Sequence, residues 1–162
     1  MILVTVGTQL PFDRLIRIVD ALAAQSEEPF VAQIGDGEYI PLHMEWHRFI
    51  EPVPFDRLLA DTRLIISHAG IGTVLNARKV GKPVILFPRQ AELGEHRNDH
   101  QRATIGSLEG RRGVYIAQDA EGIAAWLRQD LARPEQEAAG PSHEALLDRV
   151  AGHIRALGRR GR

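Results

Sequence analysis

The chain has 162 residues, of which 44% are hydrophobic and 25% are charged, and it contains no cysteine. These values are typical of one soluble globular domain, and they exclude fibrous, disordered and disulfide-stapled proteins. Without cysteine there is no thiolate metal site and no cysteine nucleophile, and the composition fits a reducing cytoplasm. The net charge of −1 gives no reason to expect a nucleic-acid partner.

Charge is distributed unevenly along the chain. Residues 1–60 carry nine acidic and four basic side chains, whereas residues 61–162 carry twelve and sixteen. The positive second part could favour an anionic ligand, although a solvated surface explains it equally well. No stretch approaches the roughly 20 apolar residues that span a bilayer. The apolar start lacks the basic segment and the cleavage site of a signal peptide, so a strand is expected there.

Short apolar runs alternate with segments of helical periodicity. The expected strands are residues 2–6, 30–34, 47–51, 64–66, 83–87 and 113–117. The expected helices begin at Pro11 and Pro54 and cover residues 71–80, 95–108, 121–131 and 143–157. This alternation predicts an α/β fold with a Rossmann-like, doubly wound parallel sheet. The residues between the second and third strands include Pro41 and two glycines, which leaves barely enough room for a helix and predicts an irregular connection.

The predicted domain boundary lies near residue 132. Residues 1–132 are expected to form one Rossmann-like domain. Residues 133–142 contain two prolines and a glycine and are interpreted as a linker. A final helix and a basic tail should then pack on or flank the same domain; the tail holds Arg155, Arg159, Arg160 and Arg162.

The first candidate ligand-binding turn is Gly7-Thr8-Gln9, directly after the first strand. In a parallel sheet, ligands bind at the carboxyl ends of the strands near the point where the strand order reverses. Glycine permits a tight turn, and the hydroxyl and amide can bind a phosphate or a base edge. A turn without any ligand is the plainer interpretation.

The second candidate turn, residues 67–73, reads Ser-His-Ala-Gly-Ile-Gly-Thr and joins a buried strand to a helix. Two glycines let backbone N–H groups approach a ligand, and a helix N-terminus favours a diphosphate. The turn lacks the Gly-Lys-Ser/Thr ending of a P-loop and the full dinucleotide-binding fingerprint. The alternative is a glycine-rich helix start in which His68 is only a turn residue.

The third candidate is residues 88–101, in which ten of fourteen residues are polar or ionisable. Carboxylates and amides that accept and donate together are suited to hydroxyl-rich ligands such as sugars. Arg89 or Arg97 could also pair with a uronate, although both could equally be surface charges. The alternative is a solvated helix start with an acidic first turn.

The order of these motifs resembles the C-terminal domain of family 28 glycosyltransferases over roughly residues 1–130. The resemblance depends on His-Ala-Gly-x-Gly-Thr followed by Gly-Glu-His-x-x-Asp-His-Gln, with Phe49-Ile50 and Gly81-Lys82-Pro83 at the expected places. As a single domain, the chain is similar to two kinds of stand-alone catalytic subunit. These are the PssE-type subunits of bacterial exopolysaccharide glycosyltransferases and the eukaryotic UDP-GlcNAc transferase subunit of lipid-linked N-glycan assembly.

The resemblance implies a single GT-B donor-binding domain with defined roles for its residues. The nucleotide would lie by the first turn, the uracil would meet the backbone of Ile50, and the diphosphate would meet the second turn. The donor sugar would face the polar cluster after Pro88. Asn76 stands where two-domain relatives hold a ribose-binding glutamate, and asparagine keeps only neutral hydrogen bonds. The implied nucleotide-sugar-binding residues are Gly7, Thr8, Gln9, Ile50, His68, Gly70, Gly72, Thr73, Asn76, Glu95, Asn98, Asp99, His100 and Gln101.

The implied reaction is transfer of a sugar from a UDP-sugar to a lipid-linked acceptor, with no metal and no cofactor. The acceptor-side domain and the general base are expected on a membrane-associated partner subunit; His68 and His100 are the local candidates for the base. The protein would be cytoplasmic and peripheral at the inner face of the membrane, and a homodimer could form in isolation. The partner is expected to cover residues 8–12 and 89–94, where Leu10, Pro11, Phe12 and Leu93 would otherwise be exposed.

Three other functions compete with transfer. A non-catalytic UDP-sugar-binding module would use the same pocket. A metallohydrolase could use His96 and His100 with Glu95, although Arg97 stands where the zincin pattern needs glutamate. A serine hydrolase acting through Ser67 lacks the Gly-x-Ser-x-Gly motif.

Overall fold

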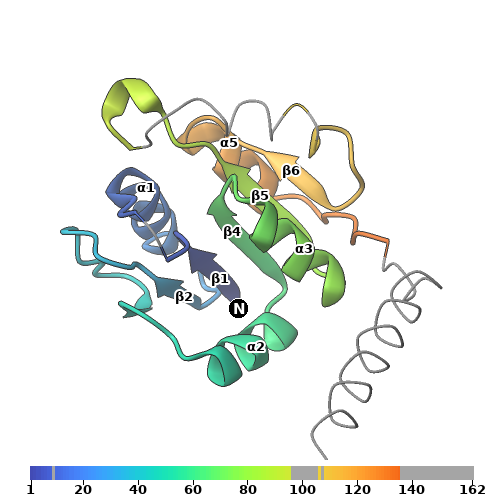
Figure 1. The fold of residues 1–162 in the computed structure, drawn as a ribbon, viewed down its shortest axis with the longest axis horizontal. Coiled ribbons are helices and arrows are strands. Elements are labelled where there is room, and N and C mark those ends of the chain that lie inside the picture. The colour runs from blue at the N-terminus through green and yellow to red at the C-terminus, as the bar shows by residue number, and fades with distance from the viewer. Residues whose placement is uncertain (9, 96–105, 107, 136–162) are drawn as a thin grey trace, which may run out of the picture.

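The computed structural model describes residues 1–8, 10–95, 106 and 108–135 (Figure 1). Its strands form one parallel sheet in the order β3-β2-β1-β4-β5-β6. The strand order reverses between β1 and β4, as it does in Rossmann folds. The strands are β1 (Ile2–Thr5), β2 (Phe30–Gln33), β3 (Glu45–His47), β4 (Leu64–His68), β5 (Val84–Phe87) and β6 (Val114–Ile116).

Helices cover both faces of the sheet (Figure 1). The buried strands present apolar side chains to each face, and the helices on that face pack against them. Ile2 and Val4 of β1 pack with α1 and α5, whereas Leu3 packs with α2 and α3. Complete burial of such a side chain stabilises the fold by about 1.5–3 kcal/mol. The helices are α1 (Asp13–Ala23), α2 (Pro52–Asp61), α3 (Ile71–Lys79) and α5 (Ala120–Leu127), with a 3₁₀ turn η1 (Ala91–Leu93).

The structure confirms the predicted α/β, Rossmann-like, doubly wound fold, and most elements lie within a few residues of their predicted bounds. One strand prediction is wrong: β3 is Glu45–His47, and residues 48–51 instead lead into α2. The three residues of β3 are all exposed, so no apolar pattern marks them. Helix α2 begins at Pro52 rather than Pro54, because the first turn of a helix accommodates proline. The helix expected at residues 143–157 and most of the one expected at 95–108 lie outside the described residues.

The connection between β2 and β3 is irregular, as predicted, and a buried carboxylate organises it. Asp20 of α1 is 1% exposed and accepts hydrogen bonds from the backbone N–H groups of Leu42 and His43 and from the Tyr39 hydroxyl. Burial alone would raise the pKa of Asp20, but these hydrogen bonds outweigh it and hold the pKa below its ordinary value. The connection that follows β2 is therefore fixed against α1.

Within the described part of the chain, no helix is long and apolar enough to cross a membrane.

Candidate functional site

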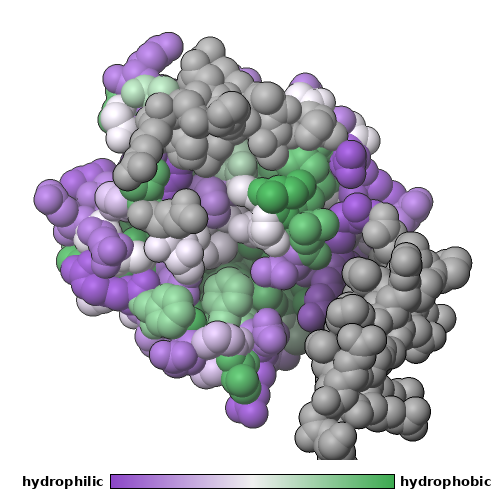
Figure 2. All heavy atoms as spheres, in the orientation of Figure 1, coloured by the Kyte–Doolittle hydropathy of each residue, from purple (hydrophilic) through white to green (hydrophobic). Residues whose placement is uncertain are grey.

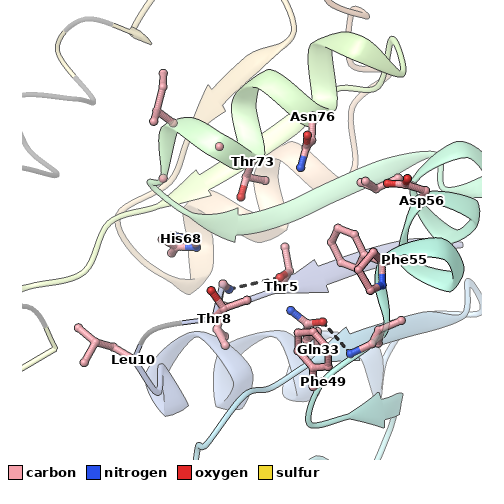
Figure 3. Close-up of a pocket in the computed structure, with 18 of the residues that line it drawn as sticks. Thr5, Thr8, Leu10, Gln33, Phe49, Phe55, Asp56, His68, Thr73 and Asn76 are labelled. Atoms are coloured by element: carbon pink, nitrogen blue, oxygen red, sulfur yellow. Dashed lines mark hydrogen bonds between the residues drawn. The ribbon is translucent and has the colours of Figure 1, made fainter. Parts of the chain in front are cut away.

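A cleft of about 700 Å³ opens at the carboxyl ends of β1 and β4, where the strand order reverses (Figure 3). This is the position at which open α/β sheets bind ligands. The walls come from the turn after β1, the end of β2, the start of α2 and the first turns of α3. The lining residues are Thr5, Val6, Gly7, Thr8, Leu10, Gln33, Phe49, Ile50, Pro52, Phe55, Asp56, Leu59, His68, Gly70, Ile71, Gly72, Thr73, Asn76 and Arg89.

The floor of the cleft is built around His68, the last residue of β4. A Cβ atom at Gly7 would lie 2.6 Å from Cε1 of His68, and one at Gly70 would overlap Nε2. Gly7 also has a φ of +80°, which side chains rarely adopt. Both glycines are therefore required for the imidazole to fit between the β1 turn and the start of α3.

Ser67 connects the three segments that meet beneath His68. Its side chain is fully buried, and its hydroxyl donates to the backbone carbonyl of Thr5 at 3.0 Å. The same oxygen lies 3.3 Å from Nδ1 of His68 and 3.2 Å from Oγ1 of Thr73. Ser67 thus fixes β1, the imidazole and the first turn of α3 relative to one another.

The N-terminus of α3 opens onto the cleft. Gly70 precedes the helix, and no side chain caps its first N–H groups. A Cβ atom at Gly72 would meet no heavy atom within 4 Å, so this position faces open space. Unpartnered N–H groups and the positive end of the helix dipole favour an anion, above all a phosphate. This end of the cleft is suited to a diphosphate.

The other end of the cleft combines aromatic rings with polar groups (Figure 3). Phe49 and Phe55 line it, and Phe49 is 58% exposed. Gln33, at the end of β2, accepts a hydrogen bond from the backbone N–H of Ile50 at 2.9 Å. Asp56 from α2 lines the cleft as well. Apolar and aromatic walls with a few fixed polar groups are typical of pockets that hold a small molecule or a cofactor.

Arg89 fixes the turn between β1 and α1. Its guanidinium is buried and donates to the backbone carbonyls of Val6, Leu10 and Pro11 at 2.9, 2.7 and 2.5 Å. It also lies 4.4 Å from the centre of the Phe12 ring. Burial lowers the pKa of Arg89. The predicted pairing of Arg89 with a uronate is not supported, because the guanidinium is already bound to the turn.

The family model of the glycosyltransferase family 28 C-terminal domain matches residues 1–152. The chain belongs to this family. The predicted family resemblance is confirmed.

Solved structures share the fold of this family 28 domain. ALG13 is 20% identical with a TM-score of 0.57, and the match covers 90% of this chain and 94% of ALG13. MurG from Acinetobacter baumannii is 23% identical with a TM-score of 0.55, over 77% of this chain and 39% of MurG. The glycosyltransferase SnogD from Streptomyces nogalater is 24% identical with a TM-score of 0.54, over 78% of this chain and 34% of SnogD. The chain thus spans only part of the last two proteins, and its domain is of the GT-B C-terminal type.

The cleft brings together eight of the residues that the sequence singled out: Gly7, Thr8, Ile50, His68, Gly70, Gly72, Thr73 and Asn76. Their roles toward a ligand stay predictions. Gln9, Asn98, Asp99, His100 and Gln101 lie outside the described residues, as do His96 and Arg97. In the part of the chain that the structure describes, no three His, Cys, Asp or Glu side chains form a group that could hold a metal ion.

The contacts of two further residues bear on their predicted roles, which stay predictions. Arg14 binds both carboxylate oxygens of Glu95 at 2.7 and 2.8 Å, and Glu95 is not among the residues that line the cleft. The backbone N–H of Ile50 donates to Gln33, so only its carbonyl remains to meet a base. One expectation is wrong. Phe12, expected on the surface, is 1% exposed and packs 5.9 Å from Phe87, ring centre to ring centre.

Eleven of the nineteen residues that line the cleft were not among the predicted nucleotide-sugar-binding residues, although one sequence signal marks two of them. Thr5 and Gln33 are polar residues at the ends of apolar strands, where a parallel sheet binds ligands. No comparable signal marks Phe55 or Asp56, which the tertiary fold brings to the cleft.

Proposed function

We propose that this family 28 domain binds a UDP-sugar and contributes the donor site for transfer of the sugar to a lipid-linked acceptor. The match of the family model over residues 1–152 is the observation that carries the proposal. The cleft supports it, because a helix N-terminus with two glycines lies at one end and an aromatic, polar slot at the other. We place the diphosphate at the α3 end and the uracil at the slot.

In this proposal the chain promotes departure of the UDP leaving group. Negative charge develops on the diphosphate as the bond to the sugar breaks, and the N–H groups of Gly72 and Thr73 would stabilise it. The helix dipole of α3 acts in the same direction. His68 lies at the floor of the cleft and is the candidate general base within the described residues, if the base is not supplied in trans.

Nucleotide preference tests the proposal directly. The slot beside Phe49 and Phe55 is proposed to be shaped for a pyrimidine, so UDP should bind more tightly than ADP or GDP. Isothermal titration calorimetry of the purified chain with the three diphosphates measures this, and a panel of UDP-sugars then identifies the donor. Equal affinities for UDP and ADP would contradict the proposed donor.

The polar cluster after Pro88, which is proposed to face the donor sugar, has its own test. Asp99→Ala should weaken binding of the preferred UDP-sugar and leave UDP nearly unchanged, because only the sugar would contact the residue. Equal loss for both ligands would place Asp99 away from the sugar.

We further propose that transfer requires a membrane-associated subunit that binds the acceptor, as in a heteromeric enzyme of exopolysaccharide or glycolipid synthesis. A donor domain offers one wall of a cleft, and reaction requires donor and acceptor within about 3–3.5 Å. Exposed apolar side chains at the cleft mouth support such a docking surface: Phe49 and Ile71 are 58% and 54% exposed. Figure 2 shows apolar residues on the face that carries α2 and α3. Leu93 is also exposed, whereas Phe12 contributes nothing to this surface.

An assay of sugar transfer to a lipid-linked acceptor distinguishes a partner-dependent transferase from a self-sufficient one and from a non-catalytic binding module. Turnover only in the presence of a second subunit is the expected result. Full turnover by the purified chain would contradict partner dependence and assign the base to His68 or His100. Binding of a UDP-sugar without turnover under any condition would favour the alternative, a non-catalytic UDP-sugar-binding module that uses the same pocket.

A further inference from the structure

Gln33 is a buried polar side chain at the carboxyl end of β2, and one half of its carboxamide has a fixed partner. The residue is 4% exposed, and its Oε1 accepts the backbone N–H of Ile50 at 2.9 Å. Because an N–H group can only donate, the carboxamide must turn its oxygen toward Ile50. The NH₂ group is therefore on the opposite side of the carboxamide. In Figure 3 this nitrogen points away from the hydrogen bond with Ile50, within the cleft.

This arrangement changes how the backbone at Ile50 can meet a base. Its N–H is engaged, so it cannot donate to a ligand. Its carbonyl receives no helical hydrogen bond from residue 54, because that residue is proline and has no N–H. In the slot, the side-chain donor placed to meet a base is therefore the NH₂ of Gln33.

A donor at this place matches the C4 position of uracil. The N3–H of uracil donates and its C4 carbonyl accepts, whereas cytosine carries an unprotonated N3 and a C4 amino group. The rings of Phe49 and Phe55 line the same end of the cleft and would hold a planar base against these groups. Cytosine in the same position would set its C4 amino group against the NH₂ of Gln33.

We propose that Gln33 determines the base specificity of the site, by donating its carboxamide NH₂ to the C4 carbonyl oxygen of uracil. The inference rests on the proposed function, since it assumes that a uridine diphosphate occupies the cleft. The hydrogen bond to Ile50 positions the carboxamide, so the donor is set before the ligand arrives. The site should prefer UDP to CDP, and TDP should satisfy the Gln33 contact as well as UDP does, because thymine keeps the C4 carbonyl.

The test is a comparison of dissociation constants for UDP, CDP and inorganic pyrophosphate, measured by calorimetry at pH 8. The chain should bind UDP at least about tenfold more tightly than CDP, the usual effect of one mismatched hydrogen bond in a buried site. Gln33→Glu keeps an acceptor for Ile50 but replaces the donor by a carboxylate, and it should abolish or reverse the preference. Gln33→Met should abolish it. Pyrophosphate affinity should stay unchanged in both variants.

Gln118→Glu is the matched control, because Gln118 is exposed and lies away from the cleft. It should retain the UDP preference. A second test needs no variant and uses 4-thio-UDP, which carries sulfur, a weaker hydrogen-bond acceptor, at C4. We expect 4-thio-UDP to bind severalfold more weakly than UDP. An unchanged ratio of UDP to CDP affinity in both Gln33 variants, or equal binding of UDP and 4-thio-UDP, would overturn the inference. Absence of UDP binding by the unaltered chain would instead contradict the proposed function itself.

Discussion

Gly72→Ala should weaken binding of a diphosphate while it stabilises the fold. Gly72 is the second residue of α3, and a Cβ atom there would meet no heavy atom within 4 Å. Alanine in place of glycine stabilises a helix by roughly 0.5–1 kcal/mol, because the unfolded chain loses backbone freedom. For a chain of this size the melting temperature should rise by about 1–3 °C.

The expected loss of affinity follows from where the new methyl group lies. It would occupy the open space beside the first N–H groups of α3, where the diphosphate is proposed to approach. We expect UDP affinity to fall at least about tenfold, which corresponds to 1.4 kcal/mol, and Gly72→Val to lose more. Calorimetry with UDP and thermal unfolding of the same samples measure both effects.

Gly70→Ala is the matched comparison, two residues earlier in the same turn. A Cβ atom at Gly70 would overlap Nε2 of His68, so this variant should lower the melting temperature. The two glycines are therefore expected to have opposite effects on stability. Unchanged UDP affinity in Gly72→Ala would refute the placement of the diphosphate. A lower melting temperature in that variant would show that Gly72 has a structural role.

Three further variants test other parts of the structure. Arg89→Lys should lower the free energy of unfolding in urea by roughly 2–3 kcal/mol, because an ammonium cannot reach the three carbonyls that the guanidinium binds; a loss below 0.5 kcal/mol would contradict this. The hydrogen bond from Arg63 lowers the pKa of Glu28 from 4.5 to about 2, so its contribution to stability is complete above about pH 4.5 and is lost as the pH falls toward 2. Glu28→Gln should therefore flatten the acid side of the stability profile, and parallel profiles would refute the assignment. Asp56→Ala should weaken UDP more than 2′-deoxy-UDP if the carboxylate accepts from the ribose; equal losses would exclude that contact.

The sequence predicted the sheet and one end of the cleft because both depend on local patterns. Apolar runs mark the buried strands, and glycines after β1 and β4 mark the turns where ligands bind. Once the strands are known to be parallel, their carboxyl ends must share one edge. This is why Gly7, Thr8, Gly70 and Gly72 could be brought together without coordinates.

The end of the cleft that holds Gln33, Phe49 and Phe55 depends on contacts that no local sequence pattern encodes. Gln33 reaches Ile50 only because β3 pairs with β2 in a register that places His47 opposite Gln33. The strand β3 is short and exposed, so its position could not be derived from apolar periodicity. Arg89 looks like a surface charge within a polar segment. It is buried because three backbone carbonyls of the β1 turn point toward it.

Three buried polar side chains shape the cleft before any ligand binds. Gln33, Ser67 and Arg89 are 4%, 0% and 6% exposed. Gln33 is hydrogen-bonded to the backbone of Ile50, whereas Ser67 and Arg89 are bonded to the backbone at the end of β1 and in the turn after it. The conformational entropy that these walls lose on becoming ordered is already lost during folding, so it does not weaken ligand binding. Substitutions at Ser67 and Arg89 should therefore reduce stability and affinity together. Gly72 and Asp56 face the cleft without such a structural contact among the described residues, so their substitution should change affinity alone or raise stability. A rise in melting temperature together with weaker UDP binding in Gly72→Ala would separate the two effects in one variant, which is the result expected of a binding site.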